Sequence, residues 1–403
     1  MTARYRAAIV GCGDIGHAHA EGFRASPDVE LVAVVDPIEP ARHQFQAEYG
    51  VSAAYPSVEE LFAAAAPDIV SVCVWHRLHA PITIAAAEAG AQAVICEKPM
   101  ATSMAEVDAM IEACDRAGTR LVVSHQRRFT PGWERARDLV RAGAIGTVRL
   151  AQGRGRNGLL NVGTHLIDAM LFILGEPDAT WVMAAVERQT DRFERDTPIE
   201  DRCMVLVELA GGAQLFVQND LPGAEGPGPT GSAGSAGPTG SAGPGIALQI
   251  TGSGGMIETS EYSARVFTAG SGGWRVEFAS DDVDTIGGRA NARQVRELIR
   301  WLDGGPEHRC SARRARPTTE IMMAAYESAR RHRLVHLPLG ERSFPLAAMI
   351  DEGLLTPSVP GPHDIRGYLR RQGIDEERYA QLRATGMGHH EIMAMLAGVR
   401  GRF

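Results

Sequence analysis

A short glycine-rich turn near the N-terminus is the feature that most constrains what this chain can fold into. Residues 6–10 form an apolar run typical of a buried strand, residues 11–16 read Gly-Cys-Gly-Asp-Ile-Gly, and a helix-like stretch follows at 17–25. Glycines at this spacing allow a tight turn, close approach of the backbone to a pyrophosphate and close packing of helix on strand. Because the free amides at a helix start favour negative charge, we predict a dinucleotide-binding βαβ unit.

An acidic residue at the end of the next expected strand supports this prediction. Residues 30–35 are mostly apolar, and Asp36 follows them, about 20 residues after Gly16. A carboxylate at this position accepts hydrogen bonds from the ribose hydroxyls of the adenosine half and repels a 2′-phosphate. We therefore expect NAD as the cofactor in preference to NADP. A glycine turn followed by an unrelated surface aspartate is the alternative.

Helix-like and strand-like segments alternate through the first third of the chain. Helices are expected at 40–49, 58–65, 82–89 and 103–117, and strands at 69–74, 93–96 and 121–124. This alternation predicts an α/β domain with a doubly wound parallel sheet over residues 1–124. In such sheets ligands lie beyond the carboxyl ends of the strands. Gly11, Asp36, Val74, Glu97 and Lys98 fall at those ends, so we expect them to line one crevice.

Lys98 is the only lysine among the 41 Lys and Arg residues of the chain. An arginine stays protonated in proteins, whereas the pKa of an ammonium group changes with burial and neighbouring charges. A site that must cycle a proton is a reason to keep lysine where arginine is otherwise the rule. Lys98 follows an apolar run and precedes Pro99, where strands end and sites form. A lysine retained by chance on a solvated face is the alternative.

The middle of the chain predicts a second, different sheet. Strands are expected at 148–152, 180–187, 203–209, 213–219, 247–251 and 255–258, within an α+β substrate domain over residues 125–340. Between the first two lies a helix at 159–174 that carries Asn161, His165 and Asp168. Their spacings of four and three residues place the three side chains on one helical face. A buried polar stripe needs partners, so it is either a satisfied core network or a site.

Several of these features together resemble the Gfo/Idh/MocA family of NAD(P)-dependent sugar and cyclitol oxidoreductases. The resemblance rests on the glycine turn, Asp36, the pair Leu78-His79, the sequence Glu-Lys-Pro at 97–99, and His165. It covers residues 6–339, with the family's closing helix and strand expected at 326–330 and 335–339. It implies an N-terminal Rossmann domain, a substrate domain with an open, mostly antiparallel sheet, and Lys98 beside the nicotinamide and the reacting carbinol.

The resemblance also implies roles for single residues. His165 is expected to act as general base or acid because its ordinary pKa lies close to working pH, with Lys98 orienting and polarising the same oxygen. Asn161 departs from the family pattern, which commonly has Asp there, so proton transfer is left to His165 and Lys98, or the chemistry is reduced or altered. Asp168 is expected to be structural.

The expected site residues fall into three sets. The expected catalytic residues are Lys98, His165 and Asn161. The expected cofactor-binding residues are Gly11, Gly13, Asp14, Ile15, Gly16, Asp36, Val74, His79, Glu97 and Lys98, and the expected substrate contacts are His125, Arg128, Asn157, Asn161 and His165.

A second departure lies at residues 74–76, which read Val-Trp-His where the family often has Thr-Pro-Asn. Trp75 or His76 is therefore expected to reshape the nicotinamide end, with simple packing of Trp75 as the alternative. Arg127 and Arg156 are further candidates for substrate contacts, because a guanidinium can grip a carboxylate or phosphate. Arginine is also this chain's default cation, which favours surface roles for both.

Composition excludes several classes of protein. The net charge of -8 and the pI near 5.9 argue against nucleic acid as a partner. No apolar run approaches the roughly 18 residues of a membrane span, and an apparent strand begins by Tyr5, which leaves no room for a signal peptide. The six cysteines are scattered singly, without metal-ligand spacing. We expect no metal and a reducing, cytoplasmic setting.

Two further segments stand apart from the expected domains. Residues 222–245 have glycine at every third position from 228 to 243, which we interpret as a flexible loop rather than a collagen-like segment. Residues 341–403 are expected to form a helical C-terminal extension with helices at 364–371, 375–384 and 389–396. A cap on the neighbouring domain or a subunit contact is the expected role of this extension.

The sequence therefore predicts a cytoplasmic NAD-dependent oxidoreductase acting on a secondary alcohol or ketone of a sugar, cyclitol or related polyol. A homo-oligomer, a dimer or tetramer, is expected. Two alternatives stay open. One is a glycosidase that retains NAD and uses transient oxidation. The other is a cofactor-binding module without turnover, for which Asn161 is the main argument.

Overall fold

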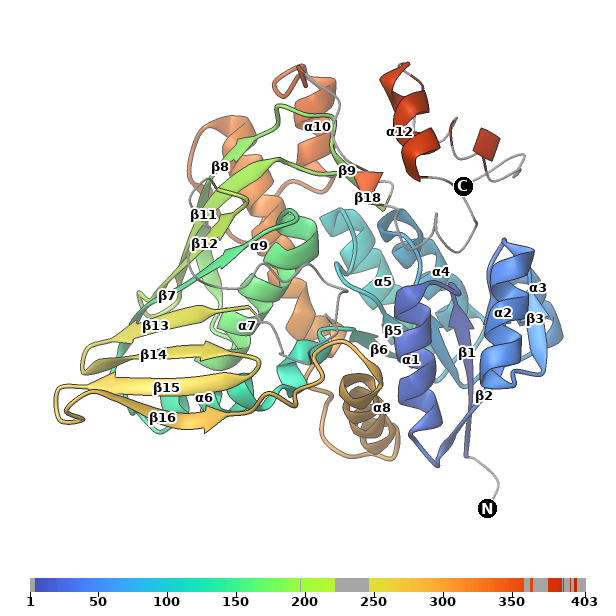
Figure 1. The fold of residues 1–403 in the computed structure, drawn as a ribbon, viewed down its shortest axis with the longest axis horizontal. Helices are drawn as coiled ribbons and strands as arrows, with labels where there is room; N and C mark the ends of the chain where they lie inside the picture. The colour runs from blue at the N-terminus through green and yellow to red at the C-terminus, as the bar shows by residue number, and fades with distance from the viewer. Residues whose placement is uncertain are drawn as a thin grey trace.

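The computed structural model of the protein describes residues 4–195, 197–221, 246–358, 363–364, 376–385, 387, 392 and 395–396. The described strands form two large sheets and one small one, with helices between the two large sheets (Figure 1). The segment expected as a flexible loop, residues 222–245, lies outside the described residues, as do most of the helices expected at 364–371 and 389–396.

The N-terminal sheet has six parallel strands in the order β3-β2-β1-β4-β5-β6, so the predicted doubly wound sheet is confirmed. Its strands are β1 (Tyr5–Val10), β2 (Val29–Val35), β3 (Ala53–Tyr55), β4 (Ile69–Val72), β5 (Ala93–Cys96) and β6 (Arg120–Val123). The helices are α1 (Asp14–Arg24), α2 (Glu39–Tyr49), α3 (Val58–Ala64), α4 (His79–Glu88) and α5 (Met104–Ala117), with the short 3-10 helix η1 (His76–Leu78) before α4. The strand order reverses between β1 and β4, where such sheets bind ligands. Strand β3 is an addition to the prediction, because three half-buried residues carry little periodic signal.

Local sequence signals account for these elements. Ser103 begins α5: its Oγ accepts a hydrogen bond from the amide of Glu106 at 3.2 Å, and the Glu106 carboxylate accepts from the Ser103 hydroxyl at 3.0 Å. Gly118 ends the same helix in the left-handed conformation that glycine adopts without strain. Strands β4 and β5 are buried along their whole length, as strands covered on both faces must be.

The second sheet has nine strands in the order β16-β15-β14-β13-β7-β12-β11-β8-β17. All neighbours are antiparallel except β7 and β12, so the predicted mostly antiparallel sheet is confirmed. Its strands are β7 (Val148–Gly155), β8 (Ala179–Glu187), β11 (Arg202–Leu209), β12 (Gln214–Asn219), β13 (Leu248–Gly252), β14 (Gly255–Ser260), β15 (Ser263–Thr268), β16 (Trp274–Ala279) and β17 (Val335–His336). Strands β15 and β16 extend the sheet beyond the predicted ones.

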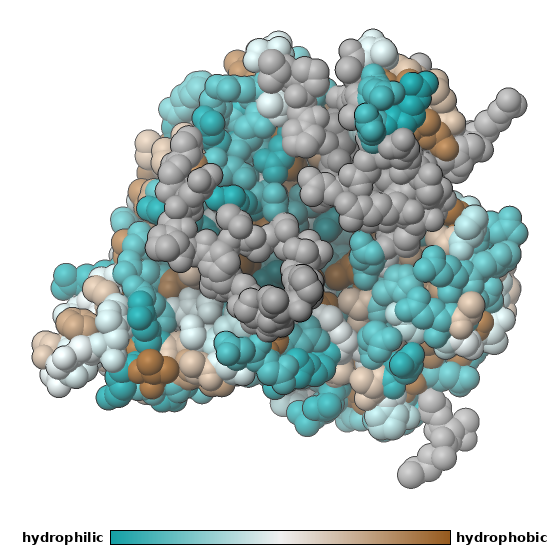
Figure 2. All heavy atoms as spheres, viewed as in Figure 1, coloured by the Kyte–Doolittle hydropathy of each residue, from teal (hydrophilic) through white to brown (hydrophobic). Residues whose placement is uncertain are grey.

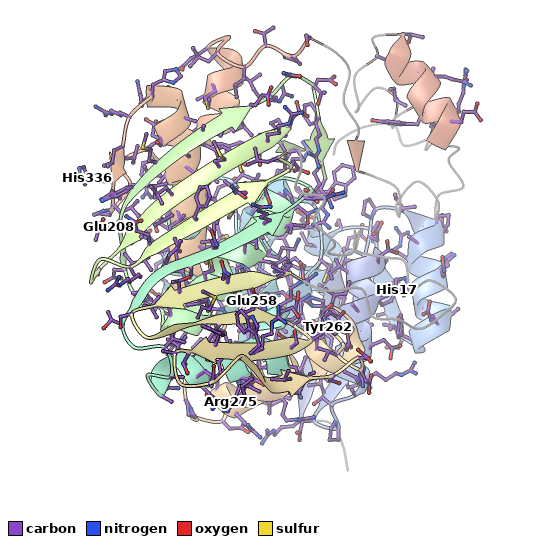
Figure 3. All side chains as sticks on the ribbon, turned by 60° about the vertical axis from the view of Figure 1, so that its left-hand side comes forward. His17, Glu208, Glu258, Tyr262, Arg275 and His336 are labelled. Atoms are coloured by element: carbon purple, nitrogen blue, oxygen red, sulfur yellow. The ribbon has the colours of Figure 1, made fainter. Side chains whose placement is uncertain are left out.

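One face of this sheet packs on helices, and no described helix covers the other, which Figure 3 shows with Glu208 and Glu258 labelled. Strand β11 alternates accordingly: Val205 and Val207 are buried on the helical side, whereas Met204 is 40% exposed on the outer side. The helices on the inner side include α6 (Pro131–Arg141), α7 (Thr164–Leu174) and α9 (Ala312–Arg331). A continuous core of buried side chains joins both large sheets through these helices.

Two helices differ from the prediction in a way that matters for the site. The helix expected at 159–174 begins as a wider π-helical turn, η3 (Leu159–Gly163), before α7. Helix α9, which contains the closing helix expected at 326–330, begins at Ala312, because Ser311 caps it and the helix continues through Pro317. A further helix, α8 (Gly288–Leu302), packs against α1 of the N-terminal domain.

The described part of the C-terminal extension contacts the rest of the molecule at two places. Strand β18 (His363–Asp364) pairs with β9 (Phe193–Glu194), which also pairs with β10 (Thr197–Pro198). Beyond α10 (Pro345–Asp351), helix α12 (Glu376–Ala384) contributes Tyr379 and Leu382 to a small cluster on which Trp75 packs. The described part of the extension therefore contacts both the N-terminal domain and the second domain.

The described surface that Figure 2 shows is largely hydrophilic, with small and separated hydrophobic patches. Within the part of the chain that the structure describes, no helix is long and apolar enough to cross a membrane.

Candidate active site

The glycine turn joins β1 to α1 at the point where the strand order reverses. Gly11 has φ +102°, and a Cβ on it would lie 2.2 Å from the carbonyl oxygen of Cys73. A Cβ on Gly16 would lie equally close to the Gly11 carbonyl, so glycine is required at both positions. Gly13 is the N-cap of α1 and offers no side-chain acceptor to the first amides of the helix. A tight turn followed by helix amides that no side chain caps is a suitable site for a pyrophosphate.

Asp36 lies directly after β2 and is bonded to the glycine turn. Its carboxylate accepts hydrogen bonds from the amides of Cys12 and Ile38, both at 2.9 Å. Burial raises the pKa of Asp36 above its ordinary value, and the two amide hydrogen bonds oppose this shift. A carboxylate has about four acceptor sites, so two remain for the hydroxyls of a ribose. Asp14 is exposed and Ile15 half-buried at the start of α1.

Glu97 and His79 hold the loop that carries Lys98. The buried Glu97 carboxylate accepts a hydrogen bond from the Lys98 amide at 3.2 Å and lies 3.0 Å from Nε2 of His19. His79 is buried with its two ring nitrogens 2.8 Å and 3.1 Å from the carbonyl oxygens of Pro99 and Val74. Glu97 and His79 are both predicted cofactor residues, but their polar atoms are paired with protein groups. In the structure these two side chains position the loop that carries Lys98.

The structure brings Lys98 and Asn161 into direct contact. Lys98 Nζ donates to Asn161 Oδ1 at 2.8 Å and lies 3.2 Å from the Asn161 carbonyl oxygen. That carbonyl lies in the π-helical turn η3. Lys98 is only 7% exposed, and this burial lowers its pKa to about 8. The ammonium is therefore poised to lose its proton near working pH.

His165 lies one helical turn beyond Asn161 and is 4% exposed. Its Nδ1 has no hydrogen-bond partner among the described residues, although buried polar atoms are usually paired. Burial lowers the pKa of His165 well below its ordinary value, and the positive charges of Arg127 and Lys98 lower it further. The imidazole is therefore neutral, with a nitrogen left for a ligand.

Arg128 and His125, two of the predicted substrate contacts, are both buried next to Asp168. Arg128 is 0% exposed; it donates to both carboxylate oxygens of Asp168 at 2.7 and 2.8 Å and to Glu176 at 2.6 Å. His125 is buried, with Nε2 3.2 Å from the hydroxyl of Thr164 and Nδ1 3.2 Å from Asp168, without hydrogen-bond geometry. Asp168 is therefore the centre of a buried network that fixes α7.

The remaining candidates lie nearer the surface. Asn157 is half-buried with φ +67°, and its amide donates to Asp220 at 3.0 Å. Arg156 is exposed, and Arg127 is paired with the buried Glu261. Sequence reasoning missed Arg195, which follows β9 with φ +47°. Burial of Lys98 is the largest cause of its lowered pKa, and the positive charge of Arg195 is the second largest. A residue in a tight turn after a two-residue strand gives no local signal by which it could be found.

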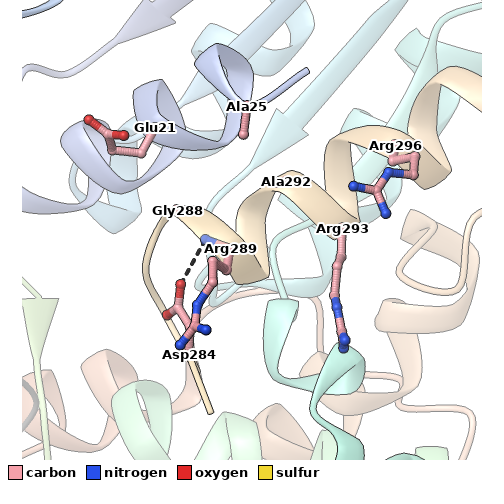
Figure 4. Close-up of a pocket in the computed structure, with 8 residues that line it drawn as sticks. All are labelled: Glu21, Ala25, Asp284, Gly288, Arg289, Ala292, Arg293 and Arg296. Carbon is pink, nitrogen blue, oxygen red and sulfur yellow. Dashed lines mark hydrogen bonds between the residues drawn. The ribbon is translucent and has the colours of Figure 1, made fainter. Parts of the chain in front are cut away.

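A hollow in the surface lies between α1 and α8, away from these residues (Figure 4). Glu21 and Ala25 line it from the C-terminal end of α1, opposite the glycine turn. Asp284 lines it before α8 and accepts a hydrogen bond from the amide of Arg289 at 2.7 Å. None of the predicted site residues lines this hollow, so we place the site at Lys98.

The sheet order, the glycine turn and Asp36 together define a dinucleotide-binding protein of the Rossmann class. Residues 5–125 match the model of the "Oxidoreductase family, NAD-binding Rossmann fold", and residues 151–258 match the "GFO/IDH/MocA C-terminal domain". The chain therefore belongs to the Gfo/Idh/MocA family of oxidoreductases, as its sequence motifs predict.

The chain is similar to known dehydrogenases in sequence and to a solved oxidoreductase in fold. The chain is 30% identical to a myo-inositol 2-dehydrogenase of Thermotoga maritima over 228 residues, which cover 53% of this chain and 68% of that protein. It is 25% identical to a D-apiose dehydrogenase of Paraburkholderia graminis over 375 residues, 87% of this chain and 94% of that protein. An oxidoreductase from Agrobacterium radiobacter, solved with NAD+, L-tartaric acid and magnesium, shares the fold with a TM-score of 0.68 at 22% identity, over 83% of this chain and 98% of that one.

Proposed function

We propose that this protein is an NAD-dependent oxidoreductase that transfers a hydride between nicotinamide and a secondary alcohol or ketone of a sugar, cyclitol or related polyol. The family and the dehydrogenase names of the relatives support this. The observation that carries the proposal is the place of the only lysine, Lys98, beside a dinucleotide fold and in contact with Asn161 of the second domain. When bound, NAD supplies the acceptor for the hydride of the carbinol carbon.

We assign to Lys98 the role of accepting the proton of the substrate hydroxyl. A neutral amine has two N–H groups, and the two oxygens of Asn161 accept both, at 2.8 and 3.2 Å. The lone pair then points away from Asn161 and is free to accept the proton of a substrate hydroxyl. With a pKa of about 8, a fraction of the amine is neutral at physiological pH, and this fraction grows as pH rises.

Asn161 is, in this interpretation, part of a working site rather than a sign of lost chemistry. A carboxylate at the same distance would stabilise the ammonium form of Lys98 and raise its pKa. An amide oxygen accepts the same hydrogen bond without adding a charge. The departure from the family pattern therefore keeps the amine titratable at neutral pH.

His165 orients the substrate hydroxyl in this proposal. Its lowered pKa makes it a weaker base than Lys98, so the main proton acceptor moves from the imidazole to the amine. A neutral imidazole still donates or accepts one hydrogen bond at each nitrogen. His165 Nδ1 has no partner of its own, which leaves it available to hold a hydroxyl.

A dehydrogenase screen tests the proposal. The full chain is offered cyclitols, hexoses, methyl glucosides and sugar acids with NAD or NADP, and the absorbance of the reduced nicotinamide is followed. We expect net reduction of NAD with at least one polyol. Product release without net reduction would support a glycosidase that retains NAD, and binding of NAD without turnover of any substrate would support a non-catalytic module.

The variant Lys98→Arg separates charge from titratability. Arginine keeps the positive charge but stays protonated, so we expect NAD to bind with unchanged affinity while alcohol oxidation falls strongly. Lys98→Met is the matched control, because it removes both the charge and the base from a side chain of similar length. Oxidation by Lys98→Arg at the wild-type rate would refute the role of Lys98.

We also propose that the chain forms a homo-oligomer through the outer face of the nine-stranded sheet. Met183, Met204, Phe267, Trp274 and Val276 are all between 38% and 64% exposed, and the strand register places them on that face. Large apolar side chains along one open sheet are typical of a subunit interface. Sedimentation of the wild type and of Met204→Glu tests this: a smaller species is expected for the variant, and an unchanged one would contradict it.

A cytoplasmic location is a further part of the proposal. All six cysteines are buried and none forms a disulfide. Free thiols persist in reducing compartments, where disulfides are rare. Fractionation of cells that produce the protein tests this directly.

A further inference from the structure

His76 is a buried imidazole that the proposed chemistry does not use. It is 1% exposed, yet neither of its ring nitrogens has a hydrogen-bond partner among the described residues. Burying a polar group without a partner destabilises a protein, so such groups are rare unless a ligand completes them. A donor and an acceptor are therefore left open at this position.

The position of His76 is next to the loop that carries Lys98. His76 opens η1 immediately after the turn that follows β4, and its ring lies edge-on to that of His79, with 5.8 Å between the centroids. His79 is itself bonded to the carbonyl of Pro99, the residue that follows Lys98. The orphaned imidazole therefore lies at the carboxyl ends of the strands, where ligands bind in this fold.

The charges around His76 keep it neutral. Burial lowers its pKa well below the ordinary value, and the positive charges of Arg195 and Lys98 lower it further. A neutral imidazole has one N–H donor and one acceptor, which suits a hydroxyl group rather than a carboxylate or phosphate.

We propose that His76 is a substrate-contacting residue, which hydrogen-bonds a hydroxyl on a carbon next to the carbinol carbon served by Lys98. This inference rests on the proposed function and deepens it. It names the substrate class as a vicinal diol, with one oxygen at Lys98 and His165 and the neighbouring oxygen at His76. Trp75, the preceding residue in the chain, packs on Tyr379 and Leu382 of α12.

A vicinal diol is then distinguished from its deoxy analogue by the unpaired imidazole. A site with a buried polar group loses affinity for a ligand that leaves this group without a partner. For one neutral hydrogen bond we expect a loss of about 10- to 100-fold in kcat/KM and in binding.

The test compares wild type with His76→Phe, which keeps the ring and removes both nitrogens, and with His76→Gln, which restores a donor and an acceptor. The ligands are myo-inositol, methyl α-D-glucoside and the monodeoxy analogues of each. Two quantities are measured: kcat/KM for oxidation, and the calorimetric dissociation constant of the same ligands from the complex with NADH. The second quantity needs no turnover.

We expect wild type to discriminate against one analogue that lacks a hydroxyl next to the reacting carbon. His76→Phe should lose this discrimination because its affinity for the full polyol falls to that for the analogue, whereas His76→Gln should recover part of it. NAD affinity should stay unchanged in all three proteins. Full discrimination in a folded His76→Phe would overturn the inference. If that variant does not fold, equal binding of every analogue by wild type would overturn it.

The outcomes also separate this inference from the proposed function. Wild type that reduces no NAD with any polyol contradicts the proposed function, and the binding comparison then still decides the role of His76. Wild type that oxidises a polyol while His76→Phe is unchanged contradicts only the inference about His76.

Discussion

Replacing Asn161 by aspartate tests the central electrostatic argument most sharply. The substitution places a negative charge at the atom that now accepts from Lys98 Nζ at 2.8 Å, with little change of shape. An opposite charge at this distance raises the pKa of an ammonium by about 1–3 units, or about 1.4–4 kcal/mol in favour of the charged form. The pKa of Lys98 should therefore move from about 8 in the wild type to well above it.

The effect on the reaction follows from the fraction of free amine. A rise of about two units in the pKa of Lys98 lowers this fraction at neutral pH about 100-fold. Because the free amine accepts the hydroxyl proton, kcat/KM for alcohol oxidation should fall by a similar factor at neutral pH and recover as the pH is raised. The assay is the pH profile of kcat/KM, with NAD affinity as a measure of intact folding.

The control is Asn161→Ala, which removes the side-chain acceptor and adds no charge. Lys98 then keeps the backbone carbonyl of residue 161, now 3.2 Å from its Nζ, so its pKa should not rise. An Asn161→Asp profile that coincides with that of wild type, or that moves to lower pH, would refute the reasoning. A rise in both variants would show that the added charge is not its cause, and this too would refute the reasoning.

Three further substitutions test other parts of the account. Gly11→Ala forces a Cβ to within 2.2 Å of a backbone carbonyl at φ +102°, so thermal unfolding should show a loss of about 3 kcal/mol or more, together with lost NAD binding. Asp36→Ser removes the charge that repels a 2′-phosphate, so the ratio of kcat/KM for NADP to that for NAD should rise about 10-fold or more; an unchanged ratio would contradict the assignment of Asp36. Arg128→Met leaves the buried carboxylate of Asp168 without its main partner, and denaturant unfolding should show a loss of about 3–5 kcal/mol, whereas a near-neutral effect would mean that the network is dispensable.

The fold and the cofactor half of the site could be predicted because their signals are local. The glycine turn, Asp36 and Lys98 each combine a distinctive residue type with a position at the end of an apolar run. Parallel strands then bring these ends to one edge of the sheet without any knowledge of side-chain packing. The spacing of Asn161, His165 and Asp168 placed them on one helical face, and the family resemblance placed that face near Lys98. The π-helical turn that holds Asn161 was not predicted.

The substrate half could not be predicted to the same depth, because burial and pairing there depend on distant residues. From the sequence alone, Arg128 is a candidate to bind an anionic substrate. In the structure its side chain is buried and donates hydrogen bonds to Asp168 and Glu176. His76 shows the reverse: nothing in the sequence reveals that its imidazole is buried and left unpaired. Whether a polar side chain is satisfied within the protein or kept for a ligand is decided by tertiary contacts.

The lone lysine permits a direct measurement of the group on which the account depends. Because the chain contains one lysine, isotope-labelled lysine gives a single side-chain NMR signal, which belongs to Lys98. Titration of this signal in the folded wild-type protein should give a midpoint close to pH 8, well below the ordinary lysine value of 10.5. A midpoint at the ordinary value would show that Lys98 is fully charged at working pH, and the assignment of its amine as the proton acceptor would be contradicted.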